Sequence, residues 1–386
     1  MILFWVSVTA TLIAAVGCGY LIAAAILVGR FGRSRTSVQA AAAPGVTVLK
    51  PLHGDEPGLF DNLISFCRQD YPGPLQIVFG VADVDDRAVA VAERLRSAER
   101  DLDLVVDRRM HGMNRKVSNL INMEPLIRHQ VVVLADSDIR VRPDHLSRVI
   151  AALEEPGVGA VTCLYYGVSF DGIWAKLSAL AINCHFLPSV VVGVAWGLAH
   201  PCFGSTIALR RETLPKIGGF EAFADCLADD YAIGAALRAR GDKISIPPFA
   251  VAHICTQRSA RELWLHDLRW ARTVKSIDPV GYAGSSVAHA FPWAVIAALA
   301  GVGSAAVLPA LGVAAASLAC RMALLRRVER VFHLPPQAYW LVPARDIWSF
   351  AVFVLSFLGR DVSWKGRRYR VVSSNHGLAG RGSQQQ

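Results

Sequence analysis

The hydrophobic positions of this chain follow two different patterns. Residues 2–28 form an unbroken apolar run, and two further apolar runs occupy residues 287–325 and 339–358. A helix needs about 20 mostly apolar residues to cross a bilayer core, so these runs predict membrane segments. From residue 46 to about 258, short apolar runs alternate with amphipathic stretches, which indicates alternating strands and helices around a mostly parallel sheet. The pattern therefore predicts an α/β domain between apolar helices.

Local patterns give the expected elements of that domain. Strands are expected at residues 46–50, 76–81, 102–106 and 131–135, and helices at 57–68, 86–100 and 117–127. The fourth strand, VVVLA, is apolar at every position, as is typical of a strand buried on both faces. No GxGxxG follows the first strand and no GxxxxGK[ST] occurs, which removes the main support for a dinucleotide or P-loop site.

The apolar runs differ in what they predict. Residues 186–198 are short for a membrane span and are expected to dip into the membrane or to lie in a core. Residues 287–325 are about twice the length of one span, and Gly301, Gly303 and Pro309 predict a hairpin between two helices. The last run carries Arg345 and Asp346. These charges are expected either to approach the headgroup of a lipid bound by the protein or to lie at the membrane interface.

Charge and composition support a membrane-associated protein. The chain has 386 residues, is 53% hydrophobic, and has a net charge of +9. The arginines cluster beside the apolar runs, at residues 30–35, 321–330 and 360–370, which favours anionic lipid headgroups over nucleic acid. Arginines after the first run place residue 30 onward in the cytoplasm by the positive-inside rule. The eight cysteines form no CxxC pair, so neither a zinc site nor a disulfide framework is predicted.

Acidic residues recur where ligands bind in open α/β sheets, at the carboxyl ends of strands. Asp83 follows the second strand, Asp136 and Asp138 follow the fourth, and Asp229 and Asp230 open a later helix. Each cluster taken alone is also compatible with a capped turn or helix start. Together they predict a site where carboxylates hold Mg²⁺ or Mn²⁺, and the metal holds a diphosphate.

Other polar residues extend this site. On a helix, His266, Arg269 and Trp270 share one face, which suits a diphosphate and a ring. Taken alone, this motif favours an interfacial helix, and the two can hold together. Lys116 is either a further positive charge for the diphosphate or a solvent-exposed lysine at a helix start. His185 is either a residue lining a lipid acceptor or a core histidine, and Gly204 is expected to let the backbone approach a sugar.

The motifs carry a resemblance to a known family. The order VADVDD, ADSDIRV, ADDY, HxxRW resembles the D, D, D, (Q/R)xxRW signature of membrane-bound inverting glycosyltransferases with a GT-A fold. The stretches VLKPLHGDEPGLFDNLISFCRQDYPGPLQIVFGVAD, NRKVSNLIN, LADSDIRVRPD and GGFEAFADCLADDYAIG resemble the ceramide glucosyltransferase family, glycosyltransferase family 21, over about residues 46–272. Within it, the chain looks closest to the bacterial branch associated with hopanoid lipids.

The resemblance implies a fold and a role for each matching residue. The fold is α/β, a GT-A type domain with a Rossmann-like mixed sheet and with N-terminal and C-terminal transmembrane helices. By this resemblance, Asp83 contacts the uridine, and Asp136 binds the metal and the diphosphate, with Asp138 completing the DxD. Asp230 is the catalytic base, with Asp229 beside it. Arg269 and Trp270 match the last motif of the signature. His266 departs from the family's glutamine or arginine.

The predicted function is transfer of one sugar, glucose or N-acetylglucosamine, from a UDP-sugar to the hydroxyl of a membrane lipid, ceramide or a hopanoid polyol. An acceptor hydroxyl needs a carboxylate to take its proton, and the leaving diphosphate needs positive charge. The alternatives are a processive polysaccharide synthase of the family 2 type and a non-catalytic membrane protein that binds nucleotide-sugar or lipid. An alanine- and arginine-rich composition suggests a bacterial inner membrane, with the catalytic domain in the cytoplasm.

The predicted organisation has six parts. They are a transmembrane anchor (1–29), a linker (30–45), a GT-A domain (46–258), an interfacial helix with the HxxRW motif (259–282), a C-terminal membrane region (283–358) and a basic cytoplasmic tail (359–386).

Overall fold

The computed structural model describes residues 1–34, 43–99, 101–359, 361–364, 367–371 and 380–381. Residues 35–42 of the predicted linker and most of the predicted tail 359–386 therefore lie outside the described residues. Contacts divide the chain into two units. The helical unit comprises Met1–Arg33, Tyr166–His200 and Gln257–Arg370, and the sheet unit comprises Ser34–Tyr165, Pro201–Thr256 and Val371–Gln386. Residues 166–200, which we expected inside the α/β domain, thus belong to the helical unit.

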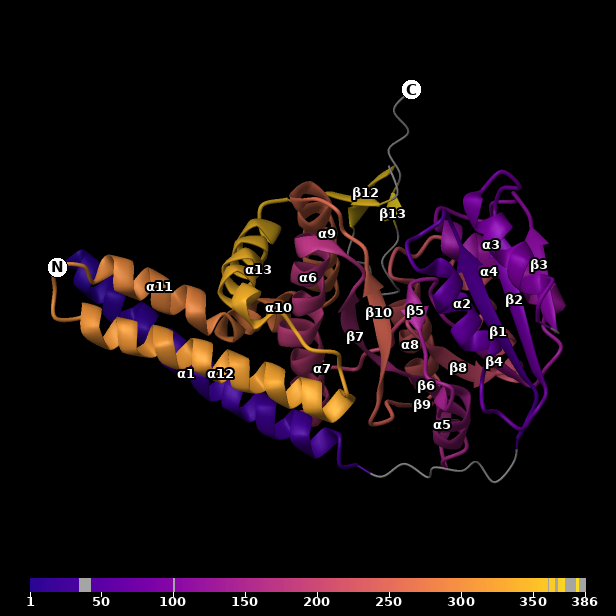
Figure 1. The fold of residues 1–386 in the computed structure, drawn as a ribbon, viewed down its shortest axis with the longest axis horizontal. Coiled ribbons are helices and arrows are strands. Elements are labelled where there is room, and N and C mark those ends of the chain that lie inside the picture. Colours follow the sequence, from indigo (N-terminus) through magenta and orange to yellow (C-terminus); the bar gives the residue numbers. More distant parts are fainter. Residues whose placement is uncertain (35–42, 100, 360, 365–366, 372–379, 382–386) are drawn as a thin grey trace. The chain divides into compact units, whose positions relative to one another are not determined.

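The sheet unit is built on a seven-stranded sheet of order β3-β2-β1-β4-β8-β6-β9. The strands are β1 Val46–Leu52, β2 Leu75–Val81, β3 Leu102–Val106, β4 Val131–Leu134, β6 Val158–Thr162, β8 Ile207–Arg210 and β9 Lys243–Ser245. The first four are parallel, with Val46 opposite both Leu75 and Val131, and β8 is antiparallel to β4 and β6. This mixed sheet confirms the predicted α/β class (Figure 1).

Helices follow the strands as the sequence pattern predicts. They are α2 Leu59–Cys67, α3 Arg87–Arg96, α4 Arg115–Met123, α5 His145–Leu153 and α8 Asp229–Ala239. One core cluster joins α4 and α8 to the central strands through side chains such as Leu120, Leu237, Leu49, Val132 and Leu209, all fully buried. Asn114 caps α4 by accepting hydrogen bonds from the amides of its second and third residues, Lys116 N and Val117 N.

A short antiparallel pair lies beside the main sheet. β5 is Ile139–Arg140 and β10 is Ala250–Cys255, with His253 opposite Ile139 and Ala252 opposite Arg140. The amide of Ile254 also donates to the carbonyl of Asp138, 2.9 Å away. This pairing fixes β10 against the segment that carries Asp136 and Asp138. Strand β7, Leu164–Ser169, crosses the boundary between the two units.

The helical unit contains α1 Ile2–Phe31, α6 Gly172–Ala181, α7 Leu187–Ala195, α9 Ala260–Ile277, α10 Pro279–Gly284, α11 Ala290–Ala300, α12 Val307–Phe332 and α13 Val342–Ser356. Helices α1, α11 and α12 pack against one another (Figure 1). The turn between α11 and α12 contains Gly301 and Gly303, the second with φ +78°, and Pro309 lies in the first turn of α12. The predicted hairpin is therefore confirmed.

Three described helices are long and apolar enough to cross a membrane: Ile2–Phe31, Gly172–Ala195 and Val307–Phe332. A fourth span is possible if Pro279–Ala288 and Ala290–Ala300, bent by 63°, act together. Residues 186–198 were expected to dip into the membrane or to lie in a core. Within them, α7 continues the helix that begins at Gly172, through a π-helical turn at Ile182–Phe186, and the helix Gly172–Ala195 as a whole is long enough to cross a membrane.

Buried ion pairs join α13 to the rest of the helical unit. Arg321, only 1% exposed, donates from Nε to Asp346 at 3.2 Å and from Nη1 to the carbonyl of Cys184 at 2.8 Å. Arg345 pairs with Asp267 at 2.7 Å. The two charges of the last apolar run are thus paired inside the helical unit, which neither expectation included. Such pairing is common for charges within membrane segments.

The remaining short elements complete the chain. They are the 3-10 turns Glu124–Leu126, Arg211–Thr213, Pro215–Ile217, Glu221–Phe223, Ser285–Ala288 and Tyr339–Leu341, and the strands β11 Asp361–Trp364, β12 Arg367–Val371 and β13 Gly380–Arg381.

Candidate active site

The carboxyl ends of β2 and β4 point to the same edge of the parallel part of the sheet, because both strands pair in parallel with β1. Asp83 lies two residues after β2, and Asp136 lies two residues after β4. The sequence prediction that acidic residues gather at this edge is therefore supported by the topology. Helix α8 adds two more carboxylates, because Asp229 and Asp230 form its first turn, where the helix dipole favours negative charge.

Lys116, on α4, contacts carboxylates from two of these elements. Its ammonium lies 2.8 Å from Asp136 Oδ1 and 3.0 Å from Asp229 Oδ2. Desolvation opposes the charged form, but the charges of Asp136, Asp229 and Asp230 outweigh it and raise the pKa of Lys116 well above its usual value. Lys116 is therefore a permanent cation between β4 and α8, and not the solvent-exposed lysine considered as the alternative.

Asp230 is held by two backbone amides. Gly204 N donates to Oδ2 at 3.0 Å, and Tyr231 N donates to Oδ1 at 2.8 Å. Burial, and then the neighbouring charge of Asp229, raise the pKa of Asp230 to about 6, while Lys116 acts in the opposite direction. At neutral pH the group is mostly ionised yet close enough to its pKa to accept a proton.

Gly204 lies among these carboxylates. A Cβ atom there would stand 2.6 Å from Asp136 Oδ2 and 3.0 Å from Lys116 Nζ. The carbonyl of Gly204 also accepts a hydrogen bond from Asp136 N at 3.1 Å. A side chain at this position would therefore displace the carboxylate of Asp136.

Asp138 has a different environment from Asp136. Its Oδ2 lies 3.5 Å from His253 Nδ1, across the β5–β10 pair. Its Oδ1 is buried and has no hydrogen-bond partner among the residues that the structure describes. Tyr165 packs on the His253 ring, with centroids 5.5 Å apart. Burial, followed by the charges of Asp230, Asp138 and Asp136, raises the pKa of Tyr165 well above its usual value.

His253 and Tyr165 were missed by sequence reasoning. His253 lies in the alternating stretch FAVAHIC, where a single polar residue at a buried strand position was the available signal. Its sequence separation from Asp138 conceals that the two side chains face each other, because only the strand pairing brings them together.

Asp83 contacts a different set of residues from Lys116 and its carboxylates. It accepts hydrogen bonds from Asp85 N at 3.1 Å and from Arg108 Nη2 at 2.6 Å, and these lower its pKa. The side chain is about half exposed.

Four predicted site residues belong to the helical unit. His266 and Trp270 stack on one face of α9, with ring centroids 5.3 Å apart, and Arg269 is on the same helix. His185 lies on the π-helical turn and shares a hydrogen bond with Asp346 over 2.9 Å. His185 is therefore hydrogen-bonded to a buried carboxylate of this unit.

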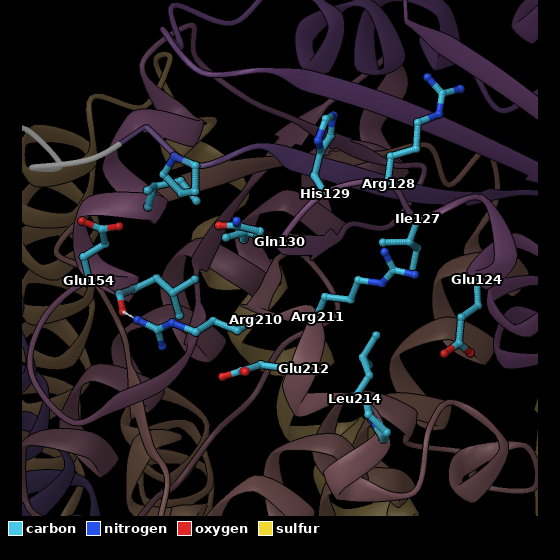
Figure 2. Close-up of a pocket in the computed structure, with 15 residues that line it drawn as sticks. Glu124, Ile127, Arg128, His129, Gln130, Glu154, Arg210, Arg211, Glu212 and Leu214 are labelled. Carbon is cyan, nitrogen blue, oxygen red and sulfur yellow. Dashed lines mark hydrogen bonds between the residues drawn. The ribbon is translucent and has the colours of Figure 1, made fainter.

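A cavity of about 760 Å³ lies at the opposite edge of the main sheet from the carboxylates. It is lined by Val131, the first residue of β4, and by Arg210, which is paired with it. Figure 2 shows Arg211, Glu124 and His129 around it, and the guanidinium of Arg210 is bonded to backbone carbonyls. The carboxylate cluster therefore lies outside this cavity.

A divalent metal fits the donor set at the carboxylate edge. In the described part of the chain, no three histidine, cysteine or acidic side chains already surround a common point. However, Asp138 offers a buried carboxylate oxygen without a partner. Mg²⁺ and similar cations commonly take only one or two carboxylates from the protein and complete their shell with phosphate oxygens and water.

Two curated proteins are similar to part of this chain. Ceramide glucosyltransferase 1 of Caenorhabditis elegans is 28% identical over 220 residues, which cover 56% of this chain and 46% of that protein. Ceramide glucosyltransferase 3 of the same organism is 26% identical over 245 residues, which cover 61% of this chain and 53% of that protein. The chain thus spans about half the length of these relatives.

A solved structure shows the same fold. The mannosyltransferase PcManGT of Pyrobaculum calidifontis, in complex with GDP-Man and Mn²⁺, superposes with a TM-score of 0.53 at 21% identity, covering 92% of this chain and 99% of that one. This likeness confirms the predicted glycosyltransferase fold. The model of the family described as "Glycosyl transferase family 21" matches residues 9–376. The chain therefore belongs to glycosyl transferase family 21.

Proposed function

We propose that this protein transfers a single sugar, glucose or N-acetylglucosamine, from a UDP-sugar to a hydroxyl of a membrane lipid, with inversion at the anomeric carbon. The acceptor is ceramide or a hopanoid polyol. The ceramide glucosyltransferases among its relatives and the apolar helices support a lipid acceptor. The proposed location is a bacterial inner membrane, with the donor supplied from the cytoplasm.

The setting of Asp230 is the observation that supports this reaction best. A general base works most efficiently when its pKa is near the working pH, and the pKa of Asp230 is raised to about 6. Its two backbone hydrogen bonds hold the carboxylate in one orientation. As the acceptor oxygen bonds to the anomeric carbon, Asp230 takes the hydroxyl proton, and the electron pair of the broken bond passes to the diphosphate.

The leaving diphosphate needs positive charge as the bond breaks. Lys116 supplies one such charge at the same edge of the sheet. A divalent metal, Mg²⁺ or Mn²⁺, held by Asp136 and Asp138 would neutralise the diphosphate further. By the family resemblance, Asp83 contacts the uridine, while Arg269 and Trp270 act on the donor. His266, which stands where the family has glutamine or arginine, is proposed on the donor side with them. His185 and Gly204 are proposed on the acceptor side.

The proposed function is tested with purified full-length protein in detergent, supplied with UDP-glucose or UDP-N-acetylglucosamine and with ceramide or a hopanoid polyol. The expected product is a lipid heavier by one hexose or one N-acetylhexosamine. Asp230→Ala and Asp136→Ala are expected to abolish it. A long polymer in place of the glycolipid would identify a processive synthase. Absence of turnover with every donor would support a binding protein instead.

A further inference from the structure

Helix α9 carries the HxxRW motif and one buried acid. Asp267 directly follows His266, and its side chain is almost inaccessible to solvent, at 8% exposure. Leu263, one turn earlier, is the other buried residue of this helix. A buried carboxylate is costly unless cations and hydrogen-bond donors surround it. The motif leaves position 267 open, so this acid needs an explanation of its own.

Two residues of helix α13 satisfy Asp267. The guanidinium of Arg345 lies 2.7 Å from Asp267 Oδ2, and the indole Nε1 of Trp348 donates to the same oxygen at 3.1 Å. On the motif side, His266 Nδ1 lies 3.4 Å from Asp267 Oδ1. Although burial opposes ionisation, Arg345 and His266 lower the pKa of Asp267. Asp267 is therefore an anion that joins α13 to the first residue of the motif.

The two residues of α13 are themselves fixed in place. Arg345 is only 4% exposed, and its Nε donates to Ser349 Oγ, one turn further along α13, at 2.9 Å. The indole of Trp348 packs edge-on against Trp264 of α9, with ring centroids 5.4 Å apart. Helix α13 thus holds α9 at two successive turns, those of Trp264 and Asp267 (Figure 1).

The rotation of α9 about its own axis decides where the motif side chains lie. His266 and Trp270 stack with ring centroids 5.3 Å apart, and Trp270 contacts Phe186 edge-on at 5.9 Å. Side-chain ends lie about 5–6 Å from a helix axis, so a rotation of about 10° moves them by about 1 Å. In a catalytic arrangement, a displacement of that size costs on the order of 100-fold in rate. Because Asp267 and His266 are neighbours on one turn, any rotation at Asp267 displaces the motif as well.

We propose that Asp267 is a positioning residue, which acts with Arg345 and Trp348 to set the rotation of α9. This rotation fixes the places of the three motif side chains, so Asp267 supports the transfer without touching the substrate. The inference rests on the proposed function, in which the motif acts on the donor. If apolar contacts alone set the rotation of α9, the same residues form only a structural ion pair.

The test removes both charges together, because a buried charge left without its partner can unfold the protein. Full-length Asp267→Asn/Arg345→Met in detergent keeps an oxygen acceptor for Trp348 and leaves no unpaired charge. We expect UDP to bind at least about tenfold more weakly than to the wild type in calorimetric titration, and the donor KM to rise by a similar factor. The acceptor KM is expected to stay unchanged. A loss of folded protein alone would lower the amount of active enzyme and leave these constants as they are.

Arg326→Met/Glu329→Gln is the matched control. Glu329 is a buried carboxylate of α12, 7% exposed, with its Oε2 3.2 Å from Arg326 Nη1. It also accepts hydrogen bonds from Gln337 N and Tyr339 Oη, which like Arg326 lie outside α9. The UDP affinity and the donor KM of this variant are expected to equal those of the wild type.

Trp348→Phe is a milder second variant. It keeps an aromatic ring and removes only the hydrogen bond to Asp267. We expect UDP to bind about threefold more weakly to it, because a smaller rotation displaces the motif less. If the double variant fails to fold, Trp348→Phe decides, and wild-type UDP affinity in it overturns the inference.

The outcomes separate this inference from the proposed function. Wild-type UDP affinity and donor KM in the double variant overturn the positioning role, as does an equal loss in the control or a rise in the acceptor KM alone. Glycolipid formation by the wild type would still support the proposed transfer. UDP binding needs no acceptor, so the variants can be compared even if no lipid is glycosylated. If wild-type protein binds no UDP, the inference and the proposed UDP-sugar donor are both contradicted.

Discussion

The contact between Gly204 and Asp136 allows a sharp test of the carboxylate cluster. In Gly204→Ala, the new Cβ would stand 2.6 Å from Asp136 Oδ2, whereas ordinary contacts begin at 3.4 Å. The carboxylate must therefore retreat by about 0.8 Å. The residue does not have a positive φ, so alanine meets no backbone strain.

This displacement should affect catalysis far more than stability. A shift of about 1 Å in a catalytic arrangement costs on the order of 100-fold in rate. The obstructing atom is the end of a side chain that can rotate, so the free energy of unfolding should change by less than about 1 kcal/mol. We therefore expect kcat to fall about 100-fold while Tm stays close to that of the wild type.

The assay measures glycolipid formation by mass spectrometry at saturating donor and acceptor, with Tm measured on the same preparation. Gly312→Ala in α12 is the control, because a Cβ there would meet no atom within 4 Å. A Gly204→Ala variant with wild-type kcat would refute the close arrangement of Gly204, Asp136 and Lys116. A variant that fails to fold would refute the stability reasoning.

Four further predictions follow from particular contacts. Because Asp230 must be ionised to act as a base and its pKa is about 6, kcat/KM should rise with pH through about 6, and Asp230→Asn should lose about 100-fold or more at every pH. Lys116→Met should move this rise to higher pH, since removing the cation raises the pKa of Asp230 further, whereas Lys116→Arg should leave it nearly unchanged. Burial lowers the pKa of Lys50 to about 7 in the folded protein. Between about pH 7 and 10.5, Lys50 is therefore protonated in the unfolded chain but mostly neutral in the folded one, so stability rises with pH. Tm should increase with pH across that window more steeply in wild type than in Lys50→Met. Arg321→Met should destabilise the helical unit by about 3–5 kcal/mol in denaturant unfolding, because it leaves Asp346 buried without its partner, and an Arg321→Met/Asp346→Leu double variant should recover part of that loss.

The sequence predicted those parts of the site that local patterns determine. The strand before Asp136 is recognisable because four consecutive apolar β-formers precede the acid, and the parallel pairing of β1, β2 and β4 then places Asp83 and Asp136 at one edge. The position of Asp229 and Asp230 in the first turn of α8 also follows from local sequence.

The parts that could not be predicted depend on contacts between distant segments. His253 meets Asp138 only through the register of β10 on β5, which no local pattern specifies. From the sequence, Arg345 and Asp346 were expected either to approach an acceptor headgroup or to lie on an interfacial helix. Their burial depends on Asp267 and Arg321, which come from two other helices. The π-helical turn at His185 likewise has no recognisable signature, so residues 186–198 looked too short to span a membrane, whereas they continue the helix that begins at Gly172.

The central claim, transfer of one sugar to a membrane lipid with Asp230 as the base, is tested most directly by mass spectrometry of lipids from cells. Extracts are compared from cells that express the wild-type chain, the Asp230→Asn variant or neither. We predict a lipid heavier by a single hexose or N-acetylhexosamine in the wild-type extract alone. An identical lipid profile in all three, or the same glycolipid at equal abundance with Asp230→Asn, would contradict the account.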